Sequence, residues 1–173
     1  MAVIRFYRAI GPWGFLSNLF PCEIVFEGRA FRSPEDAYQY AKPRDAAVAQ
    51  WLVSSPSPRL TALAAHALFW YDVSPEWNAV KVARMRAVLC AKFAQYPALA
   101  ERLIATGDAV LVENSKTDAF WGVGKNGNGK NRLGELLMEI REELKGSRTL
   151  SSPGQKPHSA SLESLLPSRI GSA

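Results

Sequence analysis

The sequence predicts a mainly α-helical (α+β) fold, a single compact helical domain with a small N-terminal antiparallel β element. The helix start pattern Ser-Pro-Glu occurs at residues 33–35 and again at 74–76, and Pro followed by an acidic residue is typical of a first helical turn. Short runs of β-branched and aromatic residues precede the first pattern. With 173 residues, 47% of them hydrophobic and 21% charged, the chain has the composition of one globular domain with a core.

The β element is expected near the N-terminus. Residues 4–7 and 23–26 are apolar-rich runs that favour strands. Glu27-Gly28 is a turn signal, so residues 29–31 are expected to return as the second arm of a hairpin. A further short strand is predicted at residues 109–112. The outline is several helices around a small N-terminal sheet.

The helices are predicted from their start and stop residues. Ser33 is a good N-cap for the first helix, and Pro43 interrupts it. Gly107 is expected to form a C-terminal cap, Asn131 to cap the last helix, and Gly146 to end it. The expected helices cover residues 33–42, 45–53, 60–69, 76–95, 98–105 and 131–145.

Composition divides the chain into a domain at residues 1–145 and a tail at residues 146–173. Half of the tail residues are Ser, Pro or Gly, which predicts a disordered or weakly helical segment. The tail has three basic residues and one acidic residue, so the net charge of +5 leaves +3 on the domain. This basicity is only a mild indication of a nucleic-acid partner.

Several classes of protein are disfavoured by simple absences. The longest nearly uncharged apolar stretch, residues 61–71, is far shorter than the roughly 20 residues of a membrane span. The N-terminus lacks the layout of a signal peptide, and two cysteines favour free thiols in a cytoplasmic protein. Two histidines without neighbouring cysteines make a zinc site unlikely to form. We therefore expect a cytoplasmic protein with no metal, no cofactor and no membrane partner, and the sequence does not indicate an oligomeric state.

One face of the helix at residues 33–42 carries reactive side chains. Glu35, Gln39 and Lys42 are spaced i, i+4 and i+7, with Tyr38 beside them. A carboxylate and an amine on one stripe suit a general acid or base and a nucleophile. The spacing alone is equally typical of a solvated charged face with a capping carboxylate.

A glycine-rich loop at residues 118–131 precedes the last helix. It is flanked by Lys125, Lys130 and Arg132, and it fits no dinucleotide-binding unit because no strand leads directly into it. Backbone amides at a helix N-terminus suit a phosphate or another anion, and Asp118 with Trp121 would suit a nucleoside. The alternative is a flexible surface loop.

Two aromatic features leave alternatives open. Trp77, Lys81 and Met85 are spaced i, i+4 and i+8 on the helix at residues 76–95, where Trp77 could stack on a base or pack in the core. The turn-rich loop at residues 11–18 could cover a pocket or plug the sheet.

Taken together, these motifs resemble the NADAR family of YbiA-like N-glycosidases. The resemblance spans roughly residues 6–144 and preserves the order of the family motifs. The motifs are Gly14-Phe15-Leu16-Ser17-Asn18, Ser33-Pro34-Glu35-Asp36-Ala37-Tyr38-Gln39-Tyr40-Ala41-Lys42, Trp77-x3-Lys81-x3-Met85, Lys92-Phe93, Thr106-Gly107-Asp108, Leu111-Val112-Glu113, Asp118-x2-Trp121-Gly122-x-Gly124 and Asn131-x-Leu133-Gly134-x3-Met138-x2-Arg141.

The resemblance implies a mainly helical fold and cleavage of an N-glycosidic bond in a small-molecule phosphoribosyl or ADP-ribosyl substrate. Family activities are hydrolysis of phosphoribosylamino-pyrimidine intermediates of riboflavin synthesis and removal of ADP-ribose from guanine in nucleic acid. We take the first as the lead hypothesis, the second as the enzymatic alternative, and a non-catalytic ADP-ribose or nucleotide reader as the alternative of another class.

The resemblance also assigns roles by position. The resemblance implies that Glu35 matches the motif carboxylate, Lys42 the lysine to which family mechanisms assign a Schiff base with C1′ of the opened ribose, and Asp118 a second carboxylate that orients water or ribose hydroxyls. The implied substrate-binding residues are Asn18, Phe15, Trp77, Trp121, Gly122, Gly124 and Asn131. Two departures, Asp36 where the family commonly has His and Ala64-Ala65-His66 in place of a basic segment, affect substrate contacts rather than reaction type.

Overall fold

The computed structural model describes residues 2–151, and within them the fold is mainly helical, as predicted. The helices are α1 (Pro34–Tyr40), α2 (Ala46–Val53), α3 (Pro58–His66), α4 (Trp77–Gln95), α5 (Pro97–Ile104) and α6 (Arg132–Ser151), with a short 3₁₀ helix η1 at Gly14–Leu16. The strands are β1 (Val3–Phe6), β2 (Ile24–Phe26), β3 (Arg29–Phe31) and β4 (Val110–Glu113). None of the described helices combines the length and hydrophobicity that a bilayer span requires.

The strands form two separate pairs rather than one N-terminal sheet. The predicted antiparallel hairpin is present, with Ile24 opposite Phe31. β1 does not join it; β1 instead pairs in parallel with β4, with Val3 opposite Val110 and Phe6 opposite Glu113. The expectation of a single N-terminal sheet was therefore wrong, because β1 pairs with a strand that lies much later in the chain.

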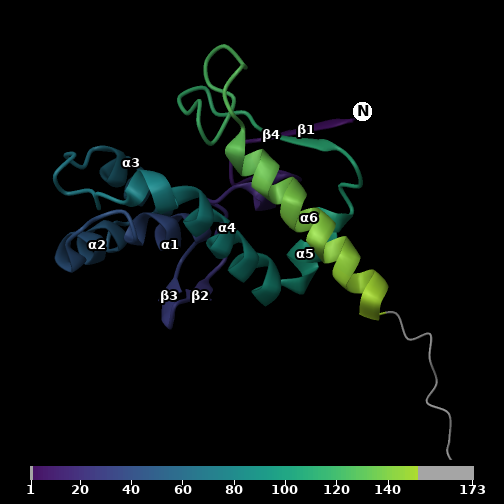
Figure 1. The fold of residues 1–173 in the computed structure, drawn as a ribbon, viewed down its shortest axis with the longest axis horizontal. Helices are drawn as coiled ribbons and strands as arrows, with labels where there is room; N and C mark the ends of the chain where they lie inside the picture. Colours follow the sequence, from purple (N-terminus) through teal and green to yellow (C-terminus); the bar gives the residue numbers. More distant parts are fainter. Residues whose placement is uncertain (1, 152–173) are drawn as a thin grey trace, which may run out of the picture.

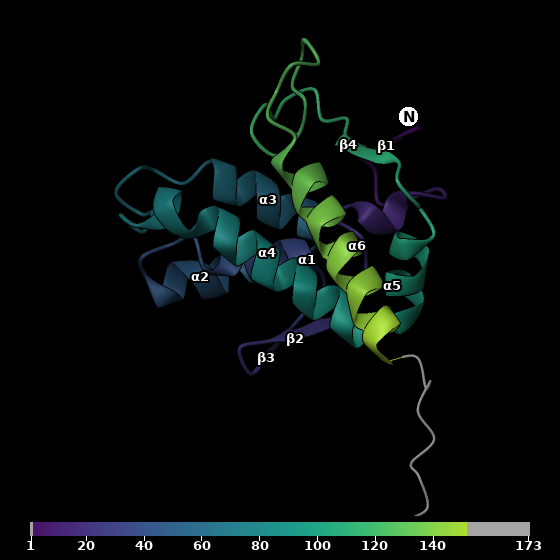
Figure 2. The same ribbon diagram turned by 45° about the vertical axis from the view of Figure 1, so that its right-hand side comes forward.

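The helices pack in two groups that share α4. α1, α2 and α3 lie together on one side of α4, whereas α5 and α6 lie on the other (Figures 1 and 2). α6 also packs on β4, and Gly134 makes this approach possible because a Cβ atom there would collide with the carbonyl oxygen of Leu111. The core follows the contact of α4 with α6 and includes Leu89, Phe93 and Leu137.

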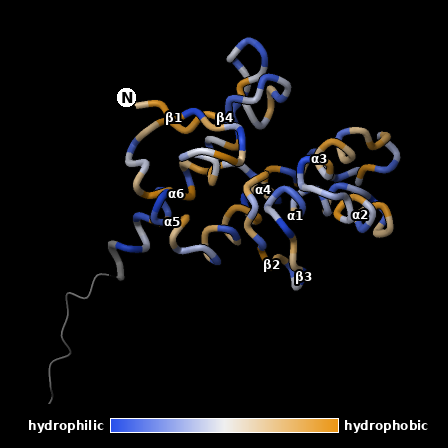
Figure 3. Tube along the Cα trace, turned by 180° about the vertical axis from the view of Figure 1, so that it is seen from behind, coloured by the Kyte–Doolittle hydropathy of each residue, from blue (hydrophilic) through white to orange (hydrophobic). Residues whose placement is uncertain are grey.

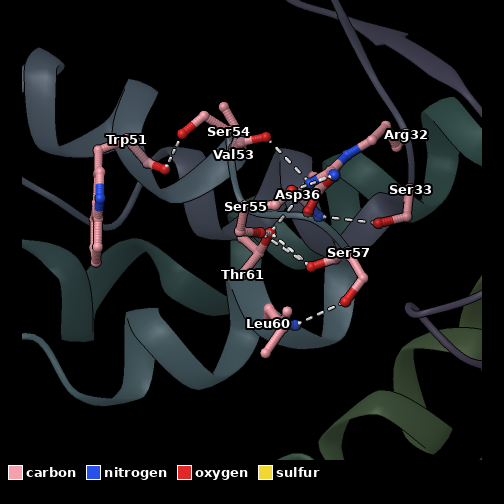
Figure 4. A network of polar contacts seen from close by, with 10 residues as sticks. All are labelled: Arg32, Ser33, Asp36, Trp51, Val53, Ser54, Ser55, Ser57, Leu60 and Thr61. Carbon is pink, nitrogen blue, oxygen red and sulfur yellow. Dashed lines mark hydrogen bonds and ion pairs between the residues drawn. The ribbon is translucent and has the colours of Figure 1, made fainter.

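The start of α1 is fixed by a network of polar contacts with the segments that flank α2 and α3 (Figure 4). The Ser33 Oγ atom accepts a hydrogen bond from the Asp36 amide, as expected of an N-cap. The buried Asp36 carboxylate accepts a hydrogen bond of 2.7 Å from Nε of Arg32. Arg32 also donates to the carbonyl oxygens of Val53, the last residue of α2, and of Ser55, which follows the helix. Asp36, one of the departures from the family motif, thus anchors α1 to α2.

α6 is longer than the sequence analysis predicted. It runs through Gly146 to Ser151 instead of ending at residue 145. A glycine inside a helix is only about 1 kcal/mol less favourable than alanine, and Arg148 forms an ion pair with Glu101 of α5. Packing against α5 therefore offsets the weak helix propensity of Gly146. The rest of the predicted tail, residues 152–173, lies outside the described residues.

Candidate active site

A cavity of about 1030 Å³ opens between α1, α3, the start of α4 and the loop that follows β4. This loop, residues 114–131, projects beyond β1 and β4 and is mostly hydrophilic (Figure 3). The cavity collects side chains from distant parts of the chain, because the parallel pairing with β1 brings the end of β4 towards α1. The residues of the sequence prediction that line it are Asn18, Glu35, Lys42, Trp77, Asp118 and Trp121.

Glu35 enters the cavity wall from the first turn of α1. Its Oε1 atom accepts a hydrogen bond of 2.8 Å from Nε2 of Gln39, one helical turn later. Burial raises the pKa of Glu35 to about 7; the neighbouring Asp36 and Asp118 raise it further, against hydrogen bonds from Gln39 and Asn18 that lower it. A carboxyl group with this pKa can accept or release a proton near neutral pH.

Lys42 lines the same cavity just beyond the end of α1. Its Nζ atom donates a hydrogen bond of 2.5 Å to the carbonyl oxygen of Ala65 in α3. Burial lowers the pKa of Lys42, and Lys81 lowers it too, whereas Glu35 raises it. A lysine with a lowered pKa is more often neutral and therefore more nucleophilic.

Asp118 lies in the loop after β4 and organises that loop. Its Oδ1 atom accepts hydrogen bonds from the amides of Phe120, at 2.7 Å, and Trp121, at 2.8 Å. Its own amide donates to Oγ of Ser115. Asp118 therefore holds Trp121 at the cavity in addition to presenting a carboxylate there.

An aromatic cluster forms one wall of the cavity. The Tyr38 ring lies 4.9 Å from that of Trp77 and 5.6 Å from that of Trp121, centroid to centroid. Trp77 is buried in the core, which is the packing alternative, and it also lines the cavity, so its stacking on a base stays a prediction. Asn18 is buried beside them, and its Nδ2 atom donates to the sulfur of Met85.

Four of the predicted binding residues lie outside the cavity lining. Phe15 is completely buried in the core, and Gly122 and Gly124 belong to the inner part of the loop. Both polar atoms of the Asn131 side chain bond to β4, Oδ1 accepting from the Glu113 amide and Nδ2 donating to the carbonyl oxygen of Leu111. Asn131 therefore positions β4 rather than capping α6.

The loop is folded against itself, and this changes the expectation of an anion site at α6. The amides of Val123 and Gly124 donate to the carbonyl oxygens of Glu113 and Asp118. The amides at the start of α6 are engaged in the same way: those of Lys130, Asn131, Arg132 and Leu133 donate to the carbonyl oxygens of Ala119, Gly122, Phe120 and Trp121. These amides are not available to a phosphate.

The sequence analysis did not assign several residues that line the cavity. Glu113 ends β4 with a side chain in the cavity, and a charged residue directly after a buried apolar run is the signal that could have identified it. His66 and Trp70 lie at the rim, where 86% of the Trp70 surface is exposed. Lys81 lies in the wall, with its ammonium 4.1 Å from the centre of the Phe120 ring.

The described residues contain no group of three or more His, Cys, Asp or Glu side chains placed to hold a metal ion. The side chains that line the cavity and can take part in chemistry include carboxyl groups, lysines and the aromatic wall. Such a set can transfer protons, form a covalent bond through an amine and stack on a planar base.

Comparisons with known proteins place the chain among characterised relatives. The NADAR domain model matches residues 5–145. The chain is 37% identical over 142 residues to the N-glycosidase YbiA of Escherichia coli, covering 82% of this chain and 88% of that protein. It is 35% identical over 151 residues to an N-glycosidase of Nostoc punctiforme, covering 86% and 96%.

Two further comparisons concern a longer protein and a solved structure. The chain is 37% identical over 142 residues to a riboflavin biosynthesis protein of Vibrio vulnificus, covering 82% of this chain but only 38% of that longer protein. The NMR structure of Escherichia coli YbiA has a TM-score of 0.79 and 34% sequence identity, and the match covers 91% of each chain.

Proposed function

The chain belongs to the NADAR family, and we propose that it is an N-glycosidase that cleaves the bond between ribose 5-phosphate and a pyrimidine-type amine, as in intermediates of riboflavin synthesis. Two relatives that match over most of their length are named N-glycosidases, which supports the reaction. The name of the Vibrio vulnificus relative supports the substrate class.

The observation that carries this proposal is the pairing of Glu35 and Lys42 in one cavity. Glu35 lies in the first turn of α1 and Lys42 just beyond the end of this helix, and both line the cavity. Burial raises the pKa of Glu35 to about 7 and lowers that of Lys42. The pKa values of the carboxyl group and of the amine are therefore both shifted towards neutral pH. Such opposed shifts are typical of groups that exchange protons or attack an electrophile.

Lys42 supplies the nucleophile in the proposed reaction. Its neutral Nζ atom attacks C1′ of the sugar, the bond from C1′ to the base nitrogen breaks, and opening of the ring leaves a Schiff base. Glu35 accepts the proton that Nζ loses on attack and passes it to the ring oxygen as the ring opens. The regenerated carboxylate then deprotonates the water that hydrolyses the Schiff base. The carboxylate of Asp118 faces the same cavity and orients that water or the ribose hydroxyls.

Substrate recognition in this proposal uses the aromatic wall and one lysine. Trp77 and Trp121 are placed around Tyr38 to contact the planar base. Because the amides of the glycine-rich loop are engaged, we assign the 5-phosphate to Lys81, which lines the cavity and whose Nζ atom bonds to Oδ1 of Asn78.

The test of this function is a turnover assay with the purified protein. Incubation with the phosphoribosylamino-pyrimidine intermediates should release ribose 5-phosphate. Borohydride added during turnover should reduce the Schiff base and leave a sugar adduct on Lys42, located by peptide mass spectrometry. A protein that binds these compounds without product or adduct would instead be a non-catalytic reader.

A second candidate, removal of ADP-ribose from guanine in nucleic acid, is favoured by the size of the cavity. About 1030 Å³ lies at the upper limit of typical small-molecule sites, and Trp70 offers an exposed indole at its rim. The same assay with ADP-ribosylated oligonucleotides decides between the substrates, since the two activities release different sugars.

A further inference from the structure

Glu113 is a carboxyl group in the cavity wall, and one of its oxygens has no hydrogen-bond partner among the described residues. It is the last residue of β4 and is largely shielded from solvent. Its Oε2 atom is fully buried, and no hydrogen-bond partner for this atom is present among the described residues. An unpartnered buried oxygen disfavours the ionised carboxylate. The Glu113 side chain also lines the cavity, where a ligand can contact its other atoms.

The amide and the carbonyl group of Glu113 are both hydrogen-bonded, so the direction in which its side chain leaves the backbone is fixed. Its amide donates a hydrogen bond of 2.8 Å to Oδ1 of Asn131. Its carbonyl oxygen accepts one of 3.0 Å from the amide of Val123, and Phe6 of β1 pairs opposite it. A side chain that lines a cavity from a backbone fixed in this way is the arrangement expected of a reactive residue.

The surroundings of Glu113 favour the protonated carboxyl. Burial raises its pKa to about 8, with further contributions from the carboxylates of Asp118 and Glu35. At neutral pH the group therefore carries an O–H that can donate. The ionisable groups that share its cavity come from α1 and the segment after it, α3, α4, the loop after β4 and the segment after β1: Glu35, Tyr38, Lys42, His66, Lys81, Asp118 and Tyr7.

The other two cavity carboxyl groups are held differently. Glu35 accepts hydrogen bonds from Gln39 and Asn18, which stabilise its ionised form. Oδ1 of Asp118 accepts two backbone amides. Donors thus bond to the carboxyl oxygens of Glu35 and Asp118, whereas the buried Oε2 atom of Glu113 receives no hydrogen bond from the described residues.

Resting on the proposed N-glycosidase function, we propose that Glu113 is the catalytic acid that protonates the departing nitrogen. The bond from C1′ to the base nitrogen breaks as Nζ of Lys42 attacks C1′. The electron pair of the broken bond stays on the nitrogen, which takes the proton of the Glu113 carboxyl and leaves as a neutral amine. Glu113, now a carboxylate, recovers its proton from solvent after the Schiff base has been hydrolysed.

The test compares the wild-type protein with Glu113→Gln and Glu113→Asp on the amine substrate. Glu113→Gln keeps the shape and the hydrogen-bonding capacity but has no proton to give. Its kcat should fall about 100-fold or more, with KM within about twofold because binding is unchanged. The wild-type kcat/KM should decline above about pH 8, and this decline should disappear in Glu113→Gln.

Two further measurements separate acid catalysis from a structural role. Substrates with electron-poor amines need less protonation, so the Glu113→Gln defect should shrink for them, and Glu113→Asp should retain part of the activity. Infrared difference spectra at pH 7 should contain a protonated-carboxyl signal that Glu113→Gln lacks. A Glu113→Gln kcat within about threefold of wild type, or an equal defect for all leaving groups, would overturn the assignment.

The assays also distinguish an error in the proposed N-glycosidase function from an error in the role of Glu113. If the folded wild-type protein releases no sugar phosphate and no ADP-ribose from either substrate class, the proposed function is wrong, and the role of Glu113 falls with it. If the wild type turns over and Glu113→Gln does so equally well, only the role of Glu113 is wrong.

Discussion

Nζ of Lys42 donates a hydrogen bond of 2.5 Å to the carbonyl oxygen of Ala65, so the amine beyond α1 is held by the backbone of α3. This contact fixes the position of the amine but is not an ion pair, because a carbonyl oxygen carries no formal charge. An ion pair would instead stabilise the protonated, non-nucleophilic form. The geometry thus suits an amine that must lose its proton before it reacts.

Lys42→Met should abolish turnover while the protein stays folded. The loss of the nucleophile should lower kcat about 100-fold or more, and borohydride should trap no adduct. Lys116→Met, which removes an exposed lysine, should leave rate and trapping unchanged. Adduct formation in the Lys42→Met protein would assign the nucleophile to another residue.

Glu35→Gln should remove the acidic limb of the pH profile. Because a base must be ionised to act, the wild-type kcat/KM should rise with pH through about 7, the pKa of Glu35. Glu35→Gln should be slow and nearly independent of pH across this range. A variant with the wild-type rise would show that another group titrates there.

Asp118→Asn separates the charge of this residue from its role in the loop. Asparagine keeps an oxygen that can accept the amides of Phe120 and Trp121, so stability should change by less than about 0.5 kcal/mol. Turnover should fall about 100-fold if the carboxylate orients water. Asp118→Ala should also lose about 1–2 kcal/mol of unfolding free energy, because both amides lose their acceptor. Full activity in Asp118→Asn would restrict the residue to holding the loop.

Lys81→Met tests the assigned phosphate contact. Loss of a charge-assisted contact should raise KM for the phosphorylated substrate about 10-fold or more. The dephosphorylated analogue, which lacks the contact, should be bound equally by wild type and variant. Lys125→Met, an exposed lysine of the neighbouring loop, is the matched control. Equal losses with both substrates would place the phosphate elsewhere.

Glu113→Gln should stabilise the protein at alkaline pH. The pKa of Glu113 rises from 4.5 to about 8 on folding, so the folded state binds more protons within this range and the wild-type unfolding free energy falls as pH increases. The penalty is complete above pH 8 and absent below 4.5. Urea unfolding should show Glu113→Gln more stable by about 1–3 kcal/mol at pH 8.5, and equally stable at pH 4.5. Glu139→Gln, which replaces an exposed carboxyl group, should differ from wild type by the same amount at both pH values. If Glu113→Gln and wild type are equally stable at pH 8.5 as well as at pH 4.5, the raised pKa of Glu113 is wrong.

The parts of the site that follow local periodicity could be predicted from the sequence. Glu35 and Gln39 share a face of α1 because the helix forms as its N-cap and first turn indicate, and the helical repeat then determines their alignment. Lys42 follows the end of α1 and lines the same cavity. The β2–β3 hairpin likewise follows from its turn residues.

The parts that depend on contacts between distant segments could not be predicted. Nothing local to β1 indicates that it pairs with β4, and without that pairing Glu113 has no evident place in the cavity. The glycine-rich loop was expected to offer free amides, but its carbonyl groups lie within reach of those amides only in the folded arrangement. Asn131 shows the same effect, because β4 engages the side chain that a local pattern assigns to capping.

The parallel pairing of β1 with β4 has a consequence for the order of events during synthesis. β1 leaves the ribosome first but has no partner until β4 has been translated. Contacts between segments so distant in sequence form slowly, because a long intervening loop must close. The wall that carries Glu113 is therefore expected to be among the last parts of the domain to assemble, and a bulky tag fused directly before Val3 would delay this step more than one placed after α6.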